Sequence, residues 1–208
     1  MTAEQRSLLG WAAAVAILAS LFAAGSLATI LRAEGQDPAN DPRFAQLRQQ
    51  YKLKGDSTDR MQTVLARSNA LIKQTAPLQT ATLVPYAAAS LLLGAAALWA
   101  RRDQSRARYV VPLAALVIGL RLVRSAVELH VATLTTKMMS DSIAAGLALG
   151  SQGKPMPRWF DTSMAVFGSL MTSEMYMSTV AWAVALAGFY GFVAAKFWRY
   201  SPASLRPL

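Results

Sequence analysis

The feature that most constrains this chain is an uncharged stretch of 24 residues near its start, LLGWAAAVAILASLFAAGSLATIL at 8–31. A helix of this length crosses the roughly 30 Å hydrocarbon core of a bilayer. Arg6 precedes the stretch and small residues occupy 23–26, an arrangement that a secretory signal peptide also has. The apolar stretch is much longer than the roughly 7–15 residues of a signal-peptide core. We therefore expect a retained membrane span.

Three further stretches, at 82–100, 109–128 and 177–197, are also rich in apolar residues. Lipid offers no hydrogen bonds, so a spanning segment must satisfy its own backbone groups, and helices do this within one segment. We predict an all-α, polytopic membrane protein with four transmembrane helices. The longer connecting segments predict a small extracytoplasmic helical domain.

The first half of the chain predicts a helical hairpin over residues 1–100. Its spans are 8–31 and 82–100, and between them we expect outer helices within 42–76. The apolar stripe of these outer helices requires a packing partner, because an isolated helix of this length is marginal in water.

The second half predicts another hairpin, over residues 101–208. We expect its first span, 109–128, to extend outward as one helix to about residue 149, and its second span to cover 177–197. The halves share an architecture but no detectable sequence repeat.

The basic residues that flank the spans predict the orientation. The 101–108 loop holds four arginines in eight residues, and the C-terminal tail carries Lys196, Arg199 and Arg206 without an acid. Segment 32–81 carries eight basic and five acidic residues, but they are mixed and spread out. The positive-inside rule then predicts a protein of the plasma (inner) membrane with both termini on the cytoplasmic side.

Composition excludes several classes of function. The chain has no cysteine and one histidine, so we expect no thiolate or histidine metal centre and no cofactor. The net charge of +10 would suggest nucleic acid in a soluble protein, but the basic residues are scattered and follow the membrane flanks. None of the common hydrolase, phosphate-loop or metalloprotease motifs occurs, so we do not expect an enzyme.

Charged residues inside the third span are the strongest candidate site. Arg121, Arg124 and Glu128 lie on one helix face, and Glu174 is expected near the level of Glu128. One interpretation is structural, with Arg124 paired to Glu128 and Arg121 facing a polar neighbour. The other is a basic constriction or anion-attracting vestibule, built by repeating the stripe around an oligomer.

Small residues at every fourth position predict tight helix packing in the first and fourth spans. Such faces let helix backbones approach closely in a membrane. The candidate packing residues are Ala12, Ala16, Ser20, Ala24, Ala183, Ala187 and Gly191.

Methionines are concentrated between residues 138 and 177. Met171 and Met175 have a spacing that resembles the Met-x-x-x-Met motif of the copper-transporter family, and thioethers suit Cu(I). The chain has neither the helix count nor the methionine-rich amino-terminal tail of that family. Methionine also fills irregular cores, so we favour packing over a metal site.

The function predicted from these features is a non-enzymatic subunit of an oligomeric membrane assembly, most simply a channel or transport component. Its partners would be the lipid bilayer and further copies or subunits, without nucleic acid. One alternative is a membrane-anchored scaffold or sensory protein that binds a partner through its outer helices. Another is a Cu(I)-handling membrane protein.

Overall fold

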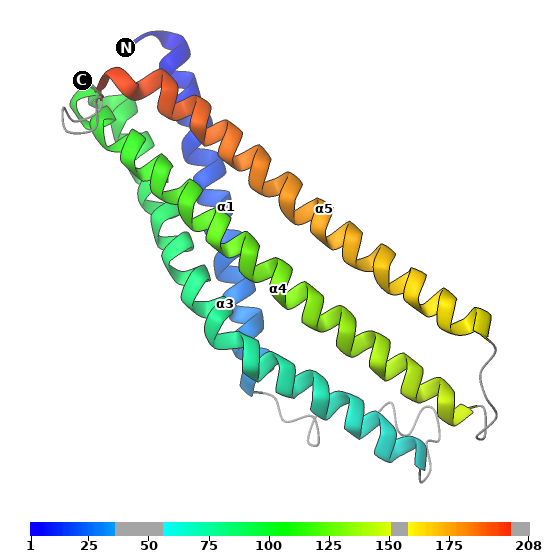
Figure 1. Ribbon diagram of the computed structural model, residues 1–208. Helices are drawn as coiled ribbons and strands as arrows, with labels where there is room; N and C mark the ends of the chain where they lie inside the picture. The colour runs from blue at the N-terminus through cyan, green and yellow to red at the C-terminus, as the bar shows by residue number, and fades with distance from the viewer. Residues whose placement is uncertain (36–55, 151–157, 201–208) are drawn as a thin grey trace. The chain divides into compact units, whose positions relative to one another are not determined.

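The computed structural model describes residues 1–35, 56–150 and 158–200 (Figure 1). The described residues form helices and no strand, so the all-α prediction is confirmed. The elements are α1 (Ala3–Gly35), α3 (Asp56–Arg102), the 3-10 helix η2 (Gln104–Tyr109), α4 (Val110–Gly150), α5 (Arg158–Phe197) and the 3-10 helix η3 (Trp198–Tyr200). Four of the described helices are long and apolar enough to cross a membrane, as the sequence predicts.

The helix α3 differs from the predicted segmentation. We expected outer helices and the span 82–100 as separate elements, whereas one helix runs from Asp56 to Arg102. The polar stretch before residue 78 and the apolar stretch after it differ in solvent preference but not in backbone hydrogen bonding, so one helix accommodates both. The part of the predicted outer helices before residue 56 lies outside the described residues.

Contacts divide the chain into two compact units. The first unit contains Met1–Ala28, Leu78–Val127 and Thr179–Leu208, and the second contains Thr29–Pro77 and Glu128–Ser178. Each unit takes a segment from all four long helices. The division therefore does not coincide with the predicted hairpins 1–100 and 101–208. Each part of a long helix contacts the parts of other helices that lie beside it, and these come from both halves of the sequence.

The N-terminus of α1 is fixed by a capping box. The Gln5 backbone N–H donates to Oγ1 of Thr2 at 3.2 Å, and the Thr2 N–H donates to Oε1 of Gln5 at 3.0 Å. These reciprocal bonds satisfy donors that a helix start leaves without intrahelical partners. The first span thus begins at a defined residue, Ala3.

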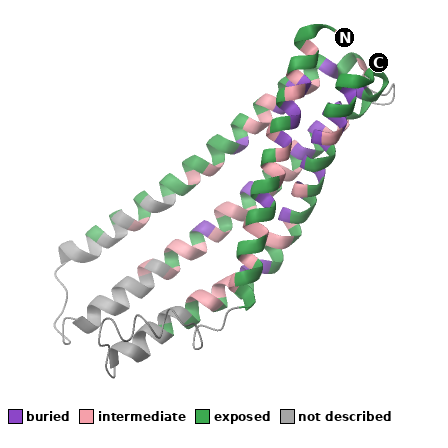
Figure 2. Cartoon of the chain, turned by 180° about the vertical axis from the view of Figure 1, so that it is seen from behind, coloured by how far each residue is buried: buried purple, intermediate pink, exposed green. Residues whose placement is uncertain are grey.

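The buried residues of the first unit, drawn in purple in Figure 2, have largely small side chains. A Cβ added to Gly94 of α3 would lie 3.0 Å from Cγ1 of Ile17, 3.5 Å from the Ala13 carbonyl oxygen and 3.7 Å from Cβ of Ala16. The helices α1 and α3 therefore approach closely at this glycine.

Large apolar side chains, in contrast, lie exposed on the same helices, among them Leu18, Phe22, Leu91, Leu116 and Trp182. In water an apolar surface of this extent would be unstable, whereas lipid solvates it. The distribution is that of a membrane protein.

In the second unit, α4 and α5 are joined by polar and close contacts. The hydroxyls of Thr133 and Tyr176 share a hydrogen bond, and Cγ2 of Thr136 lies 4.0 Å from the position of a Cβ on Gly168. Thr135 and Thr136 also donate to carbonyls one turn back, each at 2.9 Å. Threonine hydroxyls on apolar helices are satisfied by such bonds.

Candidate functional site

The first unit ends in a basic surface made by the loop between α3 and α4 and by the C-terminus of α5. The short helices η2 and η3 contact each other there. Its cationic side chains are Arg101, Arg102, Arg106, Arg108, Lys196 and Arg199. Trp99, Tyr109 and Trp198 lie beside these charges and are exposed, as in the aromatic belt at a membrane–water boundary.

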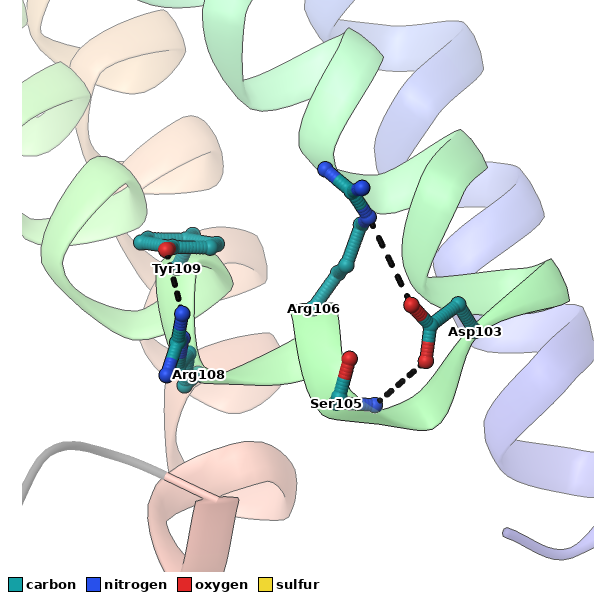
Figure 3. A network of polar contacts seen from close by, with 5 residues as sticks. All are labelled: Asp103, Ser105, Arg106, Arg108 and Tyr109. Atoms are coloured by element: carbon teal, nitrogen blue, oxygen red, sulfur yellow. Dashed lines mark hydrogen bonds and ion pairs between the residues drawn. The ribbon is translucent and has the colours of Figure 1, made fainter.

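The loop geometry is set by Asp103 (Figure 3). Its carboxylate accepts from the Ser105 N–H at 3.0 Å, caps η2, and lies 3.5 Å from Nε of Arg106. The bonds from Ser105, and then the charge of Arg106, lower the pKa of Asp103 below its ordinary value of 3.8. This contribution to loop stability is present above pH 3.8 and is lost as the pH falls through the lowered pKa of the folded state.

Two arginines of this loop are held against aromatic rings, and Figure 3 shows one of these pairs, Arg108 with Tyr109. The guanidinium of Arg106 lies 5.3 Å from the Trp99 ring centroid, and that of Arg108 lies 4.8 Å from the Tyr109 ring. Nη2 of Arg108 also donates to the Tyr109 hydroxyl at 2.7 Å. Charge and aromatic belt are therefore parts of one surface.

Arg121 lies within the third span, far from this basic end. Counting from Tyr109 at 1.5 Å per residue places its Cα about 18 Å along the helix, near the middle of a 30 Å core. The residue is half-buried, and its Nε atom is buried. A lipid-facing guanidinium at this depth would be costly, so burial against protein is the expected arrangement.

Three hydroxyl side chains lie at a similar distance from the aromatic boundary. Ser90 and Tyr86 are one turn apart on α3, about 14 and 20 Å from Trp99, and Tyr190 lies about 12 Å from Trp198 on α5. All three are buried in the first unit. We call Tyr86, Ser90, Arg121 and Tyr190 the polar layer.

Two members of the polar layer have an unusual hydrogen-bonding state. Ser90 and Tyr190 are each 0% exposed, and their hydroxyl oxygens have no hydrogen-bond partner among the described residues. Ser125, in contrast, donates to the Arg121 carbonyl at 2.9 Å, and Thr82 to the Gln79 carbonyl at 3.0 Å. A buried hydroxyl without a protein partner is destabilising, and an ordered water satisfies it only where there is room for one.

The remaining charges of the predicted stripe lie farther along the helices. Arg124 and Glu128 are half-buried and each takes part in a polar interaction, while Glu174 of α5 is exposed. A pairing of Arg124 with Glu128 stays a prediction, as does the role of Glu174.

The predicted packing residues occupy different environments. Ala12, Ala16 and Ala183 are buried, Ser20, Ala187 and Gly191 are half-buried, and Ala24 is exposed. Ala12 and Ala16 lie in the half of α1 that contacts α3 through Gly94. In the other half of the α1 stripe, Ser20 is half-buried and Ala24 is exposed.

The structure does not describe both side chains of the methionine pair, so their distance and orientation toward a metal ion are not defined. Met175 is exposed, and the Met171 side chain lies outside what the structure describes. Among the described residues no group of three or more histidine, cysteine, aspartate or glutamate side chains is placed to hold a metal ion. The Cu(I) hypothesis stays a prediction.

The sequence pointed to Arg121 but missed the hydroxyl members of the polar layer. An arginine in an apolar run is conspicuous, whereas serine and tyrosine are ordinary residues of membrane helices. A usable signal was the four-residue spacing of Tyr86 and Ser90, which places both on one face of the second span.

The fold defines an integral membrane protein with four transmembrane-length helices. Comparison with protein-family models, with curated protein sequences and with solved structures gives no match. The function therefore has to be argued from the residues themselves.

Proposed function

We propose that the protein is a non-enzymatic subunit of an oligomeric membrane assembly that serves as a channel or transport component for anions. The observation that carries the proposal is the polar layer, in which two fully buried hydroxyls lack partners among the described residues and lie about 4–6 Å nearer to the aromatic boundary than Arg121. Both hydroxyls are closed to solvent in this arrangement of the helices, so a conducting state requires that the helices part and admit water or the permeating ion to them. A guanidinium in the same layer would favour anions over cations.

An oligomer is part of the proposal, because one chain exposes small residues where membrane helices usually pack. Ala181, Ala185 and Gly188 of α5 are exposed, and a Cβ on Gly188 would meet no atom within 4 Å. Gly25 of α1 is likewise open. Lipid covers such positions less closely than a second helix does.

The orientation belongs to the same proposal. The basic surface at the end of the first unit supports a cytoplasmic location for both termini and for the 101–108 loop, in a plasma (inner) membrane.

The test of transport is anion flux into proteoliposomes. Wild-type protein should admit chloride faster than potassium, and Arg121→Gln should lower the preference for the anion by about tenfold, since one charge at low dielectric contributes more than 1.4 kcal/mol. Arg32→Gln is the matched control, because Arg32 is exposed near the end of α1 and the change in net charge is the same. Equal flux in wild type, both variants and empty liposomes would contradict the proposal.

A second candidate function rests on a cavity in the second unit. It has a volume of about 510 Å³ between α3 and α4, and its lining includes Arg67, Leu71, Gln74, Leu134 and Lys137 but no acidic residue. Such a site fits a sensory or scaffold protein that recognises an acidic partner through these helices. A partner-binding role predicts that Arg67→Gln with Lys137→Gln abolishes binding and leaves ion flux unchanged.

A further inference from the structure

A second cavity, separate from the polar layer, lies in the first unit between the start of α1 and the end of α5. Its volume is about 400 Å³. The residues that line it and matter here are Glu4, Ser7, Leu8, Trp11, Phe192 and Lys196. None of them belongs to the path proposed for ions.

The cavity lies at the level of the aromatic belt. A Cβ on Gly10 would lie 3.3 Å from Nη1 of Arg101, so this part of α1 is level with the end of α3. Trp11 is therefore close to the level of Trp99, and Lys196 is two residues before Trp198. The site is placed where lipid headgroups meet the hydrocarbon core.

The polarity of the lining changes in one direction along the two helices. Trp11 and Phe192 lie on the hydrocarbon side and are 66% and 52% exposed, so they offer aromatic surface to an acyl chain or glycerol group. Ser7 and Lys196 come next, and Glu4 lies one turn farther toward the aqueous end. This is the order of groups in a phospholipid.

The cation of this site is held in place. The Lys196 ammonium lies 5.4 Å from the centroid of the Phe192 ring, a cation–π distance. The lysine is therefore oriented toward the cavity that both residues line, where it can bind a phosphate. Glu4 on the same lining supplies a negative charge, which repels an anionic headgroup and attracts an ammonium.

We infer that this cavity binds one bilayer phospholipid with a zwitterionic, primary-amine headgroup, that is, a phosphatidylethanolamine. Lys196 and Ser7 bind the phosphate, Glu4 binds the ammonium, and Trp11 with Phe192 contacts the upper acyl chain. A purely anionic lipid such as phosphatidylglycerol satisfies Lys196 but not Glu4, so it binds less tightly.

The test is native mass spectrometry of the full chain in mild detergent, titrated with phosphatidylethanolamine or phosphatidylglycerol of identical acyl chains. Wild type should bind the first phosphatidylethanolamine more tightly than phosphatidylglycerol. Glu4→Gln should weaken phosphatidylethanolamine binding by about tenfold and leave phosphatidylglycerol unchanged or tighter, as expected for one lost charge-assisted hydrogen bond. Lys196→Gln should weaken both lipids by about tenfold.

Arg199→Gln is the matched control, because Arg199 belongs to the same basic surface but does not line the cavity. It should leave both affinities within about twofold. Loss of affinity in Arg199→Gln equal to that in Lys196→Gln would overturn the inference, since general surface charge would then explain binding. An unchanged lipid preference in Glu4→Gln would overturn it as well, and Glu4 is exposed, so this variant is expected to fold.

Discussion

At the scale of single residues, the chain places a guanidinium and several hydroxyls where the surrounding solvent is apolar. Arg121 is half-buried about 18 Å from the aromatic boundary, and the Ser90 and Tyr190 hydroxyls are fully buried. Burying a hydroxyl without a hydrogen bond costs about 1–3 kcal/mol, so two such groups in one unit require compensation. The proposed transport function would supply this compensation as water or a permeating ion that reaches the two hydroxyls.

The Ser90 hydroxyl provides a test of this argument. Ser90→Ala should change the free energy of unfolding by less than about 1 kcal/mol while it lowers chloride flux, because it removes a contact made to water rather than to protein. Ser125→Ala is the control, since its hydroxyl bonds back to the Arg121 carbonyl at 2.9 Å and should not touch a path. Thermal unfolding in detergent and liposome flux measure the two effects. A more stable Ser90→Ala protein with wild-type flux would mean that the hydroxyl lies in a dry core.

At the scale of elements, the four membrane spans are predictable from the sequence, whereas the ends of the helices that contain them are less so. Each of the four apolar stretches lies in one long helix, apart from Tyr109 at the end of η2, because lipid selects length and hydrophobicity, which can be read from the sequence. The continuity of α3 was missed, since the change from polar to apolar residues near position 78 resembles a boundary between elements. Backbone hydrogen bonding is indifferent to that change, so the helix continues.

Because α1 and α3 are in close contact at Gly94, enlarging this glycine is expected to destabilise the protein more than enlarging the exposed Gly119. Gly94→Leu should destabilise the protein by about 1–3 kcal/mol, because its Cβ would already lie 3.0 Å from Ile17 and overpacking strains the neighbouring helix. Gly119→Leu is the control, because Gly119 is exposed and a Cβ there meets nothing within 4 Å. Its stability should stay within about 0.5 kcal/mol of wild type. Thermal unfolding of both variants measures the loss of stability. An equal loss in the two variants would mean that the contact at Gly94 is loosely packed.

At the scale of the whole molecule, charge distribution is expected to set the orientation. The chain has no cysteine, so single cysteines can be introduced into an unmodified background. Gln104→Cys, in the basic loop, should resist a membrane-impermeant thiol reagent in intact cells and react after lysis. Cysteines at Lys54 and Gly153, which lie outside the described residues, should react in intact cells. The reverse pattern would invert the topology.

The candidate site is only partly predictable from the sequence, because it depends on how the helices are rotated in the whole molecule. Arg121 is visible as an isolated charge, whereas the polar layer depends on which faces of α3 and α5 turn inward. Period and composition do not give the rotation of a membrane helix, because both its lipid-facing and its protein-facing sides are apolar. For the same reason the sequence does not distinguish Ala16 from Ala24, although Ala16 is buried and Ala24 is exposed.

The exposed small residues of α5 carry the prediction for assembly. If copies of the chain pack through this face, Gly188→Leu should dissociate the oligomer by overpacking of about 1–3 kcal/mol while each chain keeps its fold, because a Cβ at Gly188 meets no atom of its own chain. Leu116→Phe, at an exposed side chain of α4 that is already large, should leave the oligomer intact, because large side chains do not allow close helix approach. Light scattering after size-exclusion chromatography in mild detergent gives the mass, and circular dichroism checks the helices. A monomeric wild type would remove the oligomer from the proposal, and an unchanged mass in Gly188→Leu would place the packing face elsewhere, because a leucine at a helix–helix contact has no room to fit.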